Sequence, residues 1–305
     1  MSELLMVLDG HNLMTRAWFG MQIRNPDGTI ETLKTSDGRE TGGLYGVIKT
    51  FMTYARQLQP THVLWTFDHG RSKYRLGIRP EYKGNRGPKD YDLTFQFKAF
   101  DEFLSLMDVR YYREEGVEAD DLMACSARWK SELPVTIVSV DHDIRQLVSK
   151  KDHGVTVLKP SMGRNGGEVF YTYDKVLENY DGLRPEQLPE LWALTGDGGD
   201  NVIGIRGIGY KRGHKLLEGG QKRLTEVLDH PKVSPYAQQV IENYQLIKLD
   251  GSPADFHVQL GECLFSEEHA DKEGLIEFCK EYEFNSFLRE IEEGTFWPPA
   301  YGKAA

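Results

Sequence analysis

The first half of the chain contains four short runs of apolar, largely β-branched residues, each ending at or near an acidic residue or a turn. Uninterrupted apolar runs of this length are typical of strands that are buried on both faces of a sheet. The runs cover residues 4–8, 62–67, 135–140 and 155–158. We therefore expect four central strands.

Stretches with the helical spacing of apolar residues lie between these runs, at residues 43–57, 93–107 and 119–131. Strands that alternate with helices along a chain are typical of a parallel sheet with helices on both faces. The sequence thus predicts an α/β fold with a mostly parallel central sheet over residues 1–175.

The pattern changes after residue 173, where short helical segments follow one another without a convincing interior strand. These segments cover residues 174–180, 185–193, 209–217, 224–228 and 235–249, with an acidic helical stretch at 268–292. We expect a mostly helical second domain over residues 176–290. Aromatic residues and prolines at 296–299 end regular structure, so residues 291–305 are predicted to form a C-terminal tail.

Composition supports a globular protein, because 39% of the 305 residues are hydrophobic and 28% are charged. No apolar run approaches the ~18 residues that cross a bilayer, and the N-terminus lacks the basic region of a signal peptide. Cys125, Cys263 and Cys279 are too few and too far apart for a disulfide framework or a zinc site. We therefore expect a cytoplasmic protein that does not bind membranes.

The net charge of −10 argues against a nucleic-acid-binding protein, but the charges are segregated along the chain. Seven basic residues and one acid lie at residues 71–89, six basic residues and one acid at 206–223, and eleven acids with three basic residues at 262–293. One basic run alone would be explained by a solvated helix face. Two such runs have to be interpreted together with the motifs beside them.

Nine carboxylates lie in five short segments, three of which follow predicted strands. They are Asp9; Asp68; Glu118, Asp120 and Asp121; Asp141 and Asp143; and Asp197 and Asp200. Any one of these acids is ordinarily explained by the helix dipole or by a turn. However, the carboxyl ends of parallel strands meet at one edge, so these acids would converge. Converging carboxylates repel unless cations lie among them, and we expect two Mg²⁺ or Mn²⁺ ions about 4 Å apart.

Six motifs in a fixed order resemble those of 5′-nucleases of the flap endonuclease type. They are Leu8-Asp9-Gly-His-Asn-Leu13 with Arg16, Thr66-Phe67-Asp68, Arg79-Pro80-Glu81-Tyr82-Lys83-Gly84-Asn85-Arg86, Glu118-Ala119-Asp120-Asp121-Leu122, Ser139-Val140-Asp141-His142-Asp143, and the stretch from Thr195 to Gly209. Together they span residues 8 to about 217. Because no polymerase region follows, the chain resembles the stand-alone enzymes of phages and bacteria, which implies a bacterial or phage-infected cell.

The resemblance implies a PIN-like fold and assigns roles to the acids. The first metal ion would be held by Asp68, Glu118 and Asp120. Asp9 would act on that ion through water. The second site would be formed by Asp121, Asp141, Asp143, Asp197 and Asp200. His142 lies between two of these acids but is expected to point away from them, because side chains alternate along an extended segment.

Lys83 and Arg86 could stabilise charge on a scissile phosphate or could simply tether it. The resemblance favours catalysis for Lys83 and stacking of Tyr82 on an unpaired base. It also implies that residues 71–97 form a helical arch, through which a single-stranded 5′ arm passes. The basic residues expected to contact DNA here are Arg71, Lys73, Arg75 and Arg79, with Arg16 in the first motif.

The glycine-rich stretch at residues 204–209 lacks the spacing and the preceding strand of a dinucleotide fingerprint. A helix-hairpin-helix over residues 190–220 explains it better, because glycines let backbone amides approach a duplex phosphate. The residues expected to contact the duplex are Gly204, Gly207, Gly209, Lys211, Arg212 and Lys215. In the family this element also binds K⁺. Gly213 departs from the family pattern, and a glycine inside a helix costs ~1 kcal/mol in propensity, so weaker duplex binding is expected.

The resemblance implies a hydrolase that cuts DNA beside the junction of a duplex and a 5′ single-stranded arm and degrades 5′ ends, leaving 5′-phosphate and 3′-hydroxyl products. Its expected partners are 5′-flap or branched DNA, duplex ends and RNA-primed DNA, and the chain is expected to be a monomer. Two alternatives are a non-catalytic branched-DNA-binding protein and a PIN-like endoribonuclease. The complete set of acids disfavours the first, and the hairpin stretch with Lys83 and Arg86 disfavours the second.

Overall fold

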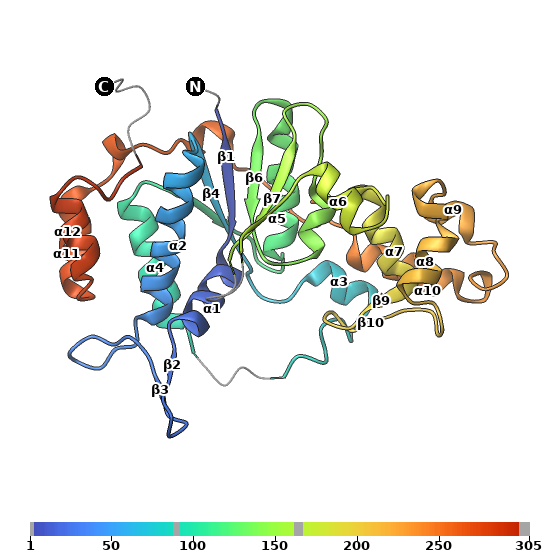
Figure 1. Cartoon of the computed structure of the whole chain (residues 1–305), viewed down its shortest axis with the longest axis horizontal. Coiled ribbons are helices and arrows are strands. Elements are labelled where there is room, and N and C mark those ends of the chain that lie inside the picture. Colours follow the sequence, from blue (N-terminus) through green and yellow to red (C-terminus); the bar gives the residue numbers. More distant parts are fainter. Residues whose placement is uncertain (1–2, 88–91, 162–166, 299–305) are drawn as a thin grey trace.

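A six-stranded sheet lies at the centre of the computed structural model, which describes residues 3–87, 92–161 and 167–298 (Figure 1). The strands are β1 (Leu5–Asp9), β4 (His62–Phe67), β5 (Arg110–Arg113), β6 (Val135–Val138), β7 (Val155–Lys159) and β8 (Val169–Tyr171). Their order is β5-β4-β1-β6-β7-β8, in which the first five strands are parallel and β8 is antiparallel to β7. The predicted α/β fold with a mostly parallel sheet is therefore confirmed.

The two faces of the sheet explain which strands could be predicted. In β1, Leu5 and Val7 pack into one core while Met6 and Leu8 pack into the other, so that successive positions are all buried. The four strands expected from apolar runs are all present. Strands β5 and β8 were not predicted, because they lie at the edges and are partly exposed: β5 has the sequence Arg-Tyr-Tyr-Arg, and β8 is only three residues long.

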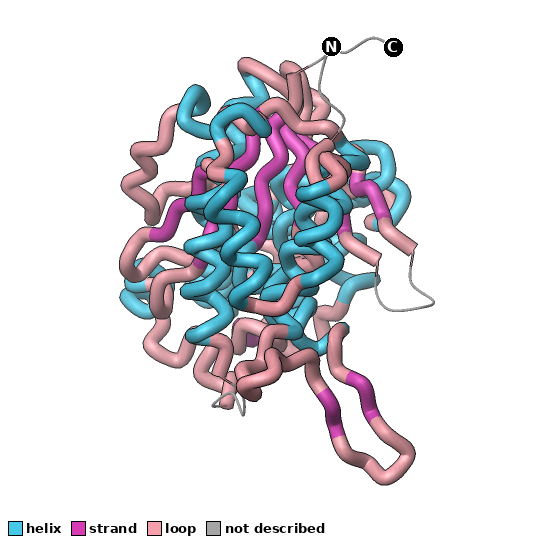
Figure 2. The backbone as a smooth tube through the Cα atoms, turned by 90° about the vertical axis from the view of Figure 1, so that its left-hand side faces the viewer, coloured by secondary structure: helices cyan, strands magenta, loops and turns pink. Residues whose placement is uncertain are grey.

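Helices α1, α2 and α4 pack into the core on one face of the sheet, and α5 packs into the core on the other. Their bounds are α1 (Gly10–Gly20), α2 (Gly42–Leu58), α4 (Thr94–Leu106) and α5 (Ala119–Ser126). After α5 the chain continues as a 3₁₀ helix to Ser131. A hairpin of β2 (Ile23–Arg24) and β3 (Ile30–Glu31), which was not predicted, projects from the body of the molecule (Figure 2).

The region after β8 is mainly helical, as expected, and its core is continuous with that of the sheet. Its helices are α6 (Tyr173–Asn179), α7 (Leu188–Thr195), α8 (Tyr210–Leu216), α9 (Leu224–Val227) and α10 (Ala237–Ile247). One apolar cluster extends from Ile137 of β6 through Leu191 of α7 to Val240 of α10. A small hairpin of β9 (Gly196–Asp197) and β10 (Val202–Ile203) joins α7 to α8, where we expected no strand. Helix α3 (Lys73–Ile78) packs on α10.

The C-terminal helices return to the α/β unit, which differs from the helical domain expected over residues 176–290. Helices α11 (Lys272–Glu281) and α12 (Asn285–Glu292) lie outside α2 and α4, at the left of Figure 1. Phe287 stacks on Tyr45 of α2 with ring centroids 4.7 Å apart, and Phe278 lies 5.7 Å from Phe103 of α4. Aromatic packing therefore assigns these helices to the core that α2 and α4 share.

Part of the tail expected over residues 291–305 also packs into this core. Phe296 is fully buried and Trp297 is nearly so, both in the cluster that contains α2 and α4. Residues 299–305 lie outside the described residues. In the part of the chain that is described, no helix combines the length and the apolarity needed to cross a membrane.

Candidate active site

Three carboxylates from neighbouring strands meet at the carboxyl edge of the sheet. Asp9 is the last residue of β1, Asp68 directly follows β4, and Asp141 follows β6 after two further residues. Strands β4, β1 and β6 are adjacent and parallel, so their carboxyl ends lie side by side. The structure therefore brings these three predicted residues to one place.

Ser139, to which the sequence analysis gave no role beyond its place in a motif, holds this arrangement. Asp9 is the N-cap of α1, and its Oδ1 accepts a hydrogen bond from the Asn12 amide at 3.1 Å. Its Oδ2 accepts one from Ser139 Oγ at 2.9 Å, and Ser139 Oγ accepts one from the Asp141 amide at 3.1 Å. Ser139 thus fixes Asp9 beside Asp141. A hydroxyl residue directly after a buried strand and two residues before an acid is the signal that identifies it.

The start of α5 brings further carboxylates to the same edge. Glu118 is the N-cap of α5, and Asp120 lies in its first turn. The Ala119 amide donates a hydrogen bond to Asp68 Oδ1 at 2.8 Å, which ties the start of α5 to the end of β4. A strand-end acid therefore sets the position of the acids on the helix.

A second group of acids surrounds Asp143, which begins a 3₁₀ helix after β6. Burial raises the pKa of Asp143 well above its ordinary value, and the charges of Asp141, Asp197 and Asp200 raise it further. Asp197 lies in β9, and Asp200 lies in the turn between β9 and β10. The hairpin of the helical region therefore carries two acids to the edge of the sheet.

Burial and neighbouring charges also perturb the first group. Burial and the charge of Asp68 are the main causes that raise the pKa of Asp9 to about 7. Burial, followed by the charges of Asp141 and Asp9, raises the pKa of Asp120 well above its ordinary value. Asp141 acts on both Asp120 and Asp143, so the two groups of acids share it.

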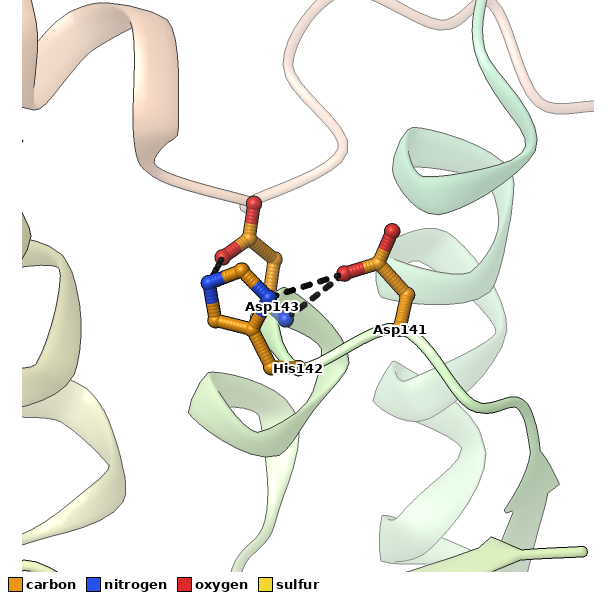
Figure 3. A group of neighbouring side chains, drawn as sticks. All are labelled: Asp141, His142 and Asp143. Carbon is orange, nitrogen blue, oxygen red and sulfur yellow. Dashed lines mark hydrogen bonds and ion pairs between the residues drawn. The ribbon is translucent and has the colours of Figure 1, made fainter. Parts of the chain in front are cut away.

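His142 faces the acids, contrary to the expectation that it points away from them (Figure 3). Its Nε2 lies 3.1 Å from Asp143 Oδ1 and 3.5 Å from Asp197 Oδ2, and its Nδ1 lies 3.7 Å from Asp141 Oδ1. Strand β6 ends at Val138 and a 3₁₀ helix begins at Asp143. The alternation of an extended segment therefore does not apply to His142.

Lys83 and Arg86 reach the acids from the segment between α3 and α4. Lys83 Nζ lies 2.7 Å from Glu118 Oε1 and 3.6 Å from Asp200 Oδ2, and Arg86 Nη2 lies 2.7 Å from Asp200 Oδ1. Burial alone would lower the pKa of Lys83, but Glu118 and Asp200 outweigh it and raise that pKa. The Lys83 amide also donates to the Asp200 carbonyl at 3.1 Å, so backbone and side chain both join this segment to the hairpin.

Two residues expected to contact DNA are buried instead. Tyr82 is 3% exposed, and its hydroxyl lies 2.7 Å from Asp200 Oδ2 and 3.2 Å from Glu118 Oε2, so the expected stacking on a base does not fit this position. Arg75 is 1% exposed and donates to both oxygens of Asp121, at 2.6 and 2.9 Å. Asp121, expected to be a metal ligand, is therefore bound to Arg75 through both of its carboxylate oxygens.

The other basic residues of the expected arch, Arg71, Lys73 and Arg79, are not fully buried as Arg75 is. Arg71 and Lys73 are exposed, and Arg79 packs on α10 through Asn243 at 3.0 Å. Residues 88–91 of the expected arch lie outside the described residues. Arg16 lies apart from them, half-buried at a cavity of about 380 Å³ between α1 and α2.

Helices α7 and α8 and the hairpin between them have the order expected of a helix-hairpin-helix. Gly207 has a φ of 82°, which favours glycine, and Gly209 is the N-cap of α8. A Cβ atom on Gly204 would lie 2.2 Å from the Thr195 carbonyl, so the two backbones approach too closely for a side chain. The exposed basic residues of α8 are Lys211, Arg212 and Lys215.

Gly213 has a packing role that the sequence alone did not reveal. A Cβ atom there would lie 2.8 Å from Leu191 Cδ1 and 3.1 Å from Thr195 Cγ2. Helix α8 therefore approaches α7 more closely than a larger residue would allow, and this packing offsets the low helix propensity of Gly213.

The donors at this edge fit hard divalent cations. Apart from His142, the converging ligands are carboxylate oxygens, which Mg²⁺ and Mn²⁺ prefer. Asp141, His142 and Asp143 each place a ligand atom within 4.8 Å of the other two. Burial, followed by the charges of neighbouring acids, raises the pKa values of Asp9, Asp120 and Asp143, so a cation among them would favour their ionised forms. The site can therefore hold cations.

Mg²⁺ is expected to raise the melting temperature more at about pH 8 than at about pH 5.5. A carboxyl group whose pKa is raised on folding stabilises the folded state at low pH. That contribution is lost as the pH rises from the unfolded value of 3.8 through the folded value, about 7 for Asp9. Mg²⁺ binds only ionised carboxylates, so it should restore stability mainly above this window. Thermal unfolding in EDTA and in excess Mg²⁺ measures the two shifts, and equal shifts at both pH values would contradict the prediction.

Comparisons with known proteins agree with these features. Residues 4–181 match the family model described as 5′-3′ exonuclease, N-terminal resolvase-like domain. The chain is 33% identical over 217 residues to DNA polymerase I of Chloroflexus aurantiacus, an alignment that covers 70% of this chain and 22% of the polymerase. It is 29% identical over 302 residues to DNA polymerase I of Bacillus subtilis, covering 95% of this chain and 32% of the polymerase. The chain thus spans a third or less of the length of these relatives.

Among solved structures, the fold is similar to that of the bacteriophage T5 D15 flap endonuclease in complex with DNA and metal ions. The TM-score is 0.62 at 22% identity, covering 95% of this chain and 98% of that one. The catalytic core of Rad2 with a DNA substrate is also similar, with a TM-score of 0.55 at 14% identity, covering 96% of this chain and 92% of that one. These likenesses support the fold class. The family model covers more than half of the chain, and the chain therefore belongs to the 5′-3′ exonuclease family that the sequence motifs resemble.

Proposed function

We propose that this protein is a structure-specific 5′ nuclease that hydrolyses DNA phosphodiesters with two divalent metal ions and leaves 5′-phosphate and 3′-hydroxyl products. The observation that carries the proposal is the convergence of carboxylates from the sheet edge, α5 and the β9–β10 hairpin. Family membership supports a catalytic protein, because every acid expected from the family is present in the sequence.

The two groups of acids correspond to two metal ions. The first ion would be held by Asp68, Glu118 and Asp120, and Asp9 would act on it through water. The second ion would be held by Asp141, Asp143, Asp197 and Asp200. When bound, such ions polarise the scissile phosphate and lower the pKa of the attacking water. A K⁺ ion at the helix-hairpin-helix is part of the same proposal, on the basis of the family resemblance.

Lys83 and Arg86 act on the scissile phosphate. Without metal, they neutralise Glu118 and Asp200 at distances of 2.7 Å. With cations on these acids, both side chains would be able to contact phosphate oxygens instead. Lys83 would then stabilise negative charge in the transition state, and Arg86 would orient the phosphate through its planar fork.

The DNA duplex binds the helix-hairpin-helix at residues 190–220, and the single-stranded 5′ arm passes the arch at residues 71–97 to reach the acids. Exposed basic residues in both segments support this path. Two similar proteins, the T5 D15 flap endonuclease and Rad2, were solved with DNA. The proposed substrates are 5′-flap and branched DNA, duplex ends and RNA-primed DNA, cut by a cytoplasmic monomer during replication and repair.

Lys211→Ala and Lys215→Ala are each expected to weaken duplex binding and to lower the slope of log K against log salt concentration by about one. Each of these exposed side chains would lose one phosphate contact and so release fewer counterions. Fluorescence anisotropy of a labelled duplex at several salt concentrations measures the slope. Lys280→Ala on α11 serves as the control, and an unchanged slope in both α8 variants would exclude α8 from the duplex contact.

A labelled 5′-flap substrate, incubated with and without Mg²⁺, tests the proposed function. We expect cleavage near the junction only with Mg²⁺, and little cleavage of a matched 3′-flap substrate. Binding of the 5′ flap without cleavage would favour a non-catalytic branched-DNA-binding protein. Cleavage of single-stranded RNA in preference to the flap would favour a PIN-like endoribonuclease.

A further inference from the structure

One arginine is almost completely buried between α5 and the helical region. Arg75 of α3 is 1% exposed, and its side chain donates hydrogen bonds in three directions. Its Nε donates to the Leu246 carbonyl of α10 at 2.8 Å. Its terminal nitrogens donate to Asp121 at 2.6 and 2.9 Å, and Nη1 also donates to Glu118 Oε2 at 3.1 Å. A planar guanidinium held at so many points fixes the orientation of its partners.

Glu118 is the partner that belongs to the candidate active site. Its Oε2 accepts the bond from Arg75 and lies 3.2 Å from the Tyr82 hydroxyl, whereas its Oε1 lies 2.7 Å from Lys83 Nζ. Although Glu118 is the N-cap of α5, its side chain makes no capping hydrogen bond. The helix itself therefore does not orient this carboxylate. Buried donors fix one oxygen, and the other oxygen, which contacts Lys83, is the one left to bind a divalent ion.

Asp121 supplies the charge that allows Arg75 to be buried. It is fully buried, and Arg75 contacts both of its oxygens. A guanidinium buried without such a partner is strongly unfavourable. This pairing explains why an acid directly follows Asp120, since successive residues of a helix point about 100° apart.

Helix α10 connects the same arginine to the second group of acids. Asn243, one turn before Leu246, is fully buried and donates to the Ile203 carbonyl of β10 at 2.8 Å. Strand β10 pairs with β9, which contains Asp197. One helix thus supports Glu118 through Arg75 and the hairpin acids through Asn243.

We propose that Arg75 is a positioning residue for metal binding, which holds Glu118 in the orientation that a divalent ion requires, and that Asp121 is its counter-charge and not a metal ligand. The inference rests on the proposed function, because it takes Glu118 to bind metal. Removing a hydrogen-bond partner of a metal ligand typically lowers metal affinity about 10- to 100-fold while the ligand itself remains.

Arg75→Gln is accordingly expected to weaken Mg²⁺ binding at least about tenfold, as measured by calorimetric titration without DNA. Arg56→Gln is the matched control. Arg56 also pairs with a carboxylate, that of Glu290, and donates to a carbonyl, that of Phe296 at 2.8 Å, but it joins α2 to the C-terminal segment. We expect its Mg²⁺ affinity to equal that of the wild type.

Folding is separated from positioning by a second variant. Arg75→Gln leaves Asp121 buried without a counter-charge, so its melting temperature is measured beside its Mg²⁺ affinity. The double variant Arg75→Met/Asp121→Leu replaces the ion pair by apolar side chains of similar size, which often preserves or improves stability. Glu118 loses Arg75 in both variants, so both should show the same loss of Mg²⁺ affinity.

Asp121→Asn tests the second half of the proposal. Arg75 still contacts Glu118 in this variant, so Mg²⁺ affinity should fall by less than about threefold, whereas loss of a true ligand should weaken binding at least about tenfold. A tenfold loss of Mg²⁺ affinity in Asp121→Asn would show that Asp121 is a metal ligand. Wild-type Mg²⁺ affinity in Arg75→Gln and in the folded double variant would overturn the positioning role. Failure of the proposed function is separately visible, as a wild-type protein that binds Mg²⁺ but does not cleave a 5′ flap.

Discussion

Asp141→Ala is expected to lower Mg²⁺-dependent cleavage of 5′-flap DNA by about a thousandfold or more, while binding of the same DNA in Ca²⁺ remains measurable. Asp141 belongs to both groups of acids, because its charge raises the pKa values of Asp120 and of Asp143. Its loss should therefore weaken both of the proposed metal sites at once. The exposed basic residues proposed to bind DNA are unaffected. Single-turnover cleavage and fluorescence anisotropy measure the two effects separately.

Asp120→Ala is the companion variant and should behave in the same way, because Asp120 is surrounded by the carboxylates that end β1, β4 and β6. Asp174→Ala, which removes an exposed carboxylate of α6, should cleave like the wild type. Near-normal Mg²⁺-dependent turnover in both Asp120→Ala and Asp141→Ala would remove these residues from the site.

The strand-end acids could be predicted from the sequence for a simple physical reason. Strands β1, β4 and β6 lie in the interior of the sheet and are buried on both faces, so each forms an unbroken apolar run with a visible end. An acid at that end is carried to the edge where the neighbouring strands also end. The apolar runs before Asp9 and Asp68 are therefore enough to predict that these two acids lie at the edge of the sheet. The edge strand β5, with its sequence Arg-Tyr-Tyr-Arg, gives no such signal.

The roles within the helices could not be predicted in the same way. Asp120 and Asp121 are neighbours in the sequence, but Asp120 faces the strand-end acids and Asp121 faces Arg75. The direction in which each side chain points depends on how α5 is rotated about its axis against the sheet. The short acidic sequence at the start of α5 does not reveal this rotation. Arg71 and Arg75 likewise belong to one basic run, yet one is exposed and the other is buried, because α3 packs on α10.

Packing between segments that are distant in the sequence could not be predicted either. The apolar residues of α11 and α12 predict that these helices are buried on one face, but they do not tell which surface covers that face. Phe278 and Phe287 pack on α4 and α2, which are well over a hundred residues earlier in the chain. A division of the chain by secondary-structure type therefore placed these helices in the wrong unit.

Lys83→Ala is expected to lower the single-turnover rate of flap cleavage about a hundredfold and to change DNA affinity in Ca²⁺ by less than about threefold. Lys83 is the cation nearest to Glu118 Oε1, at 2.7 Å, and it also lies 3.6 Å from Asp200. If a phosphate is held beside Glu118 and Asp200, the ammonium group of Lys83 would stabilise the charge that grows in the transition state more than the charge of the bound substrate. Rapid-quench cleavage and anisotropy in Ca²⁺ measure the two quantities, with Lys175→Ala on α6, which pairs with Glu178, as control.

Mg²⁺ affinity separates this role from a supporting one. Without metal, Lys83 neutralises Glu118 and Asp200, so it competes with a cation for the same acids. If Lys83 acts on the phosphate, Lys83→Ala should cleave slowly although its Mg²⁺ affinity is equal to or higher than that of the wild type. If Lys83 instead orients Glu118 for the metal, rate and Mg²⁺ affinity should fall together, as proposed for Arg75→Gln. If Lys83→Ala lowers only DNA affinity, then Lys83 serves only to bind a phosphate of the DNA.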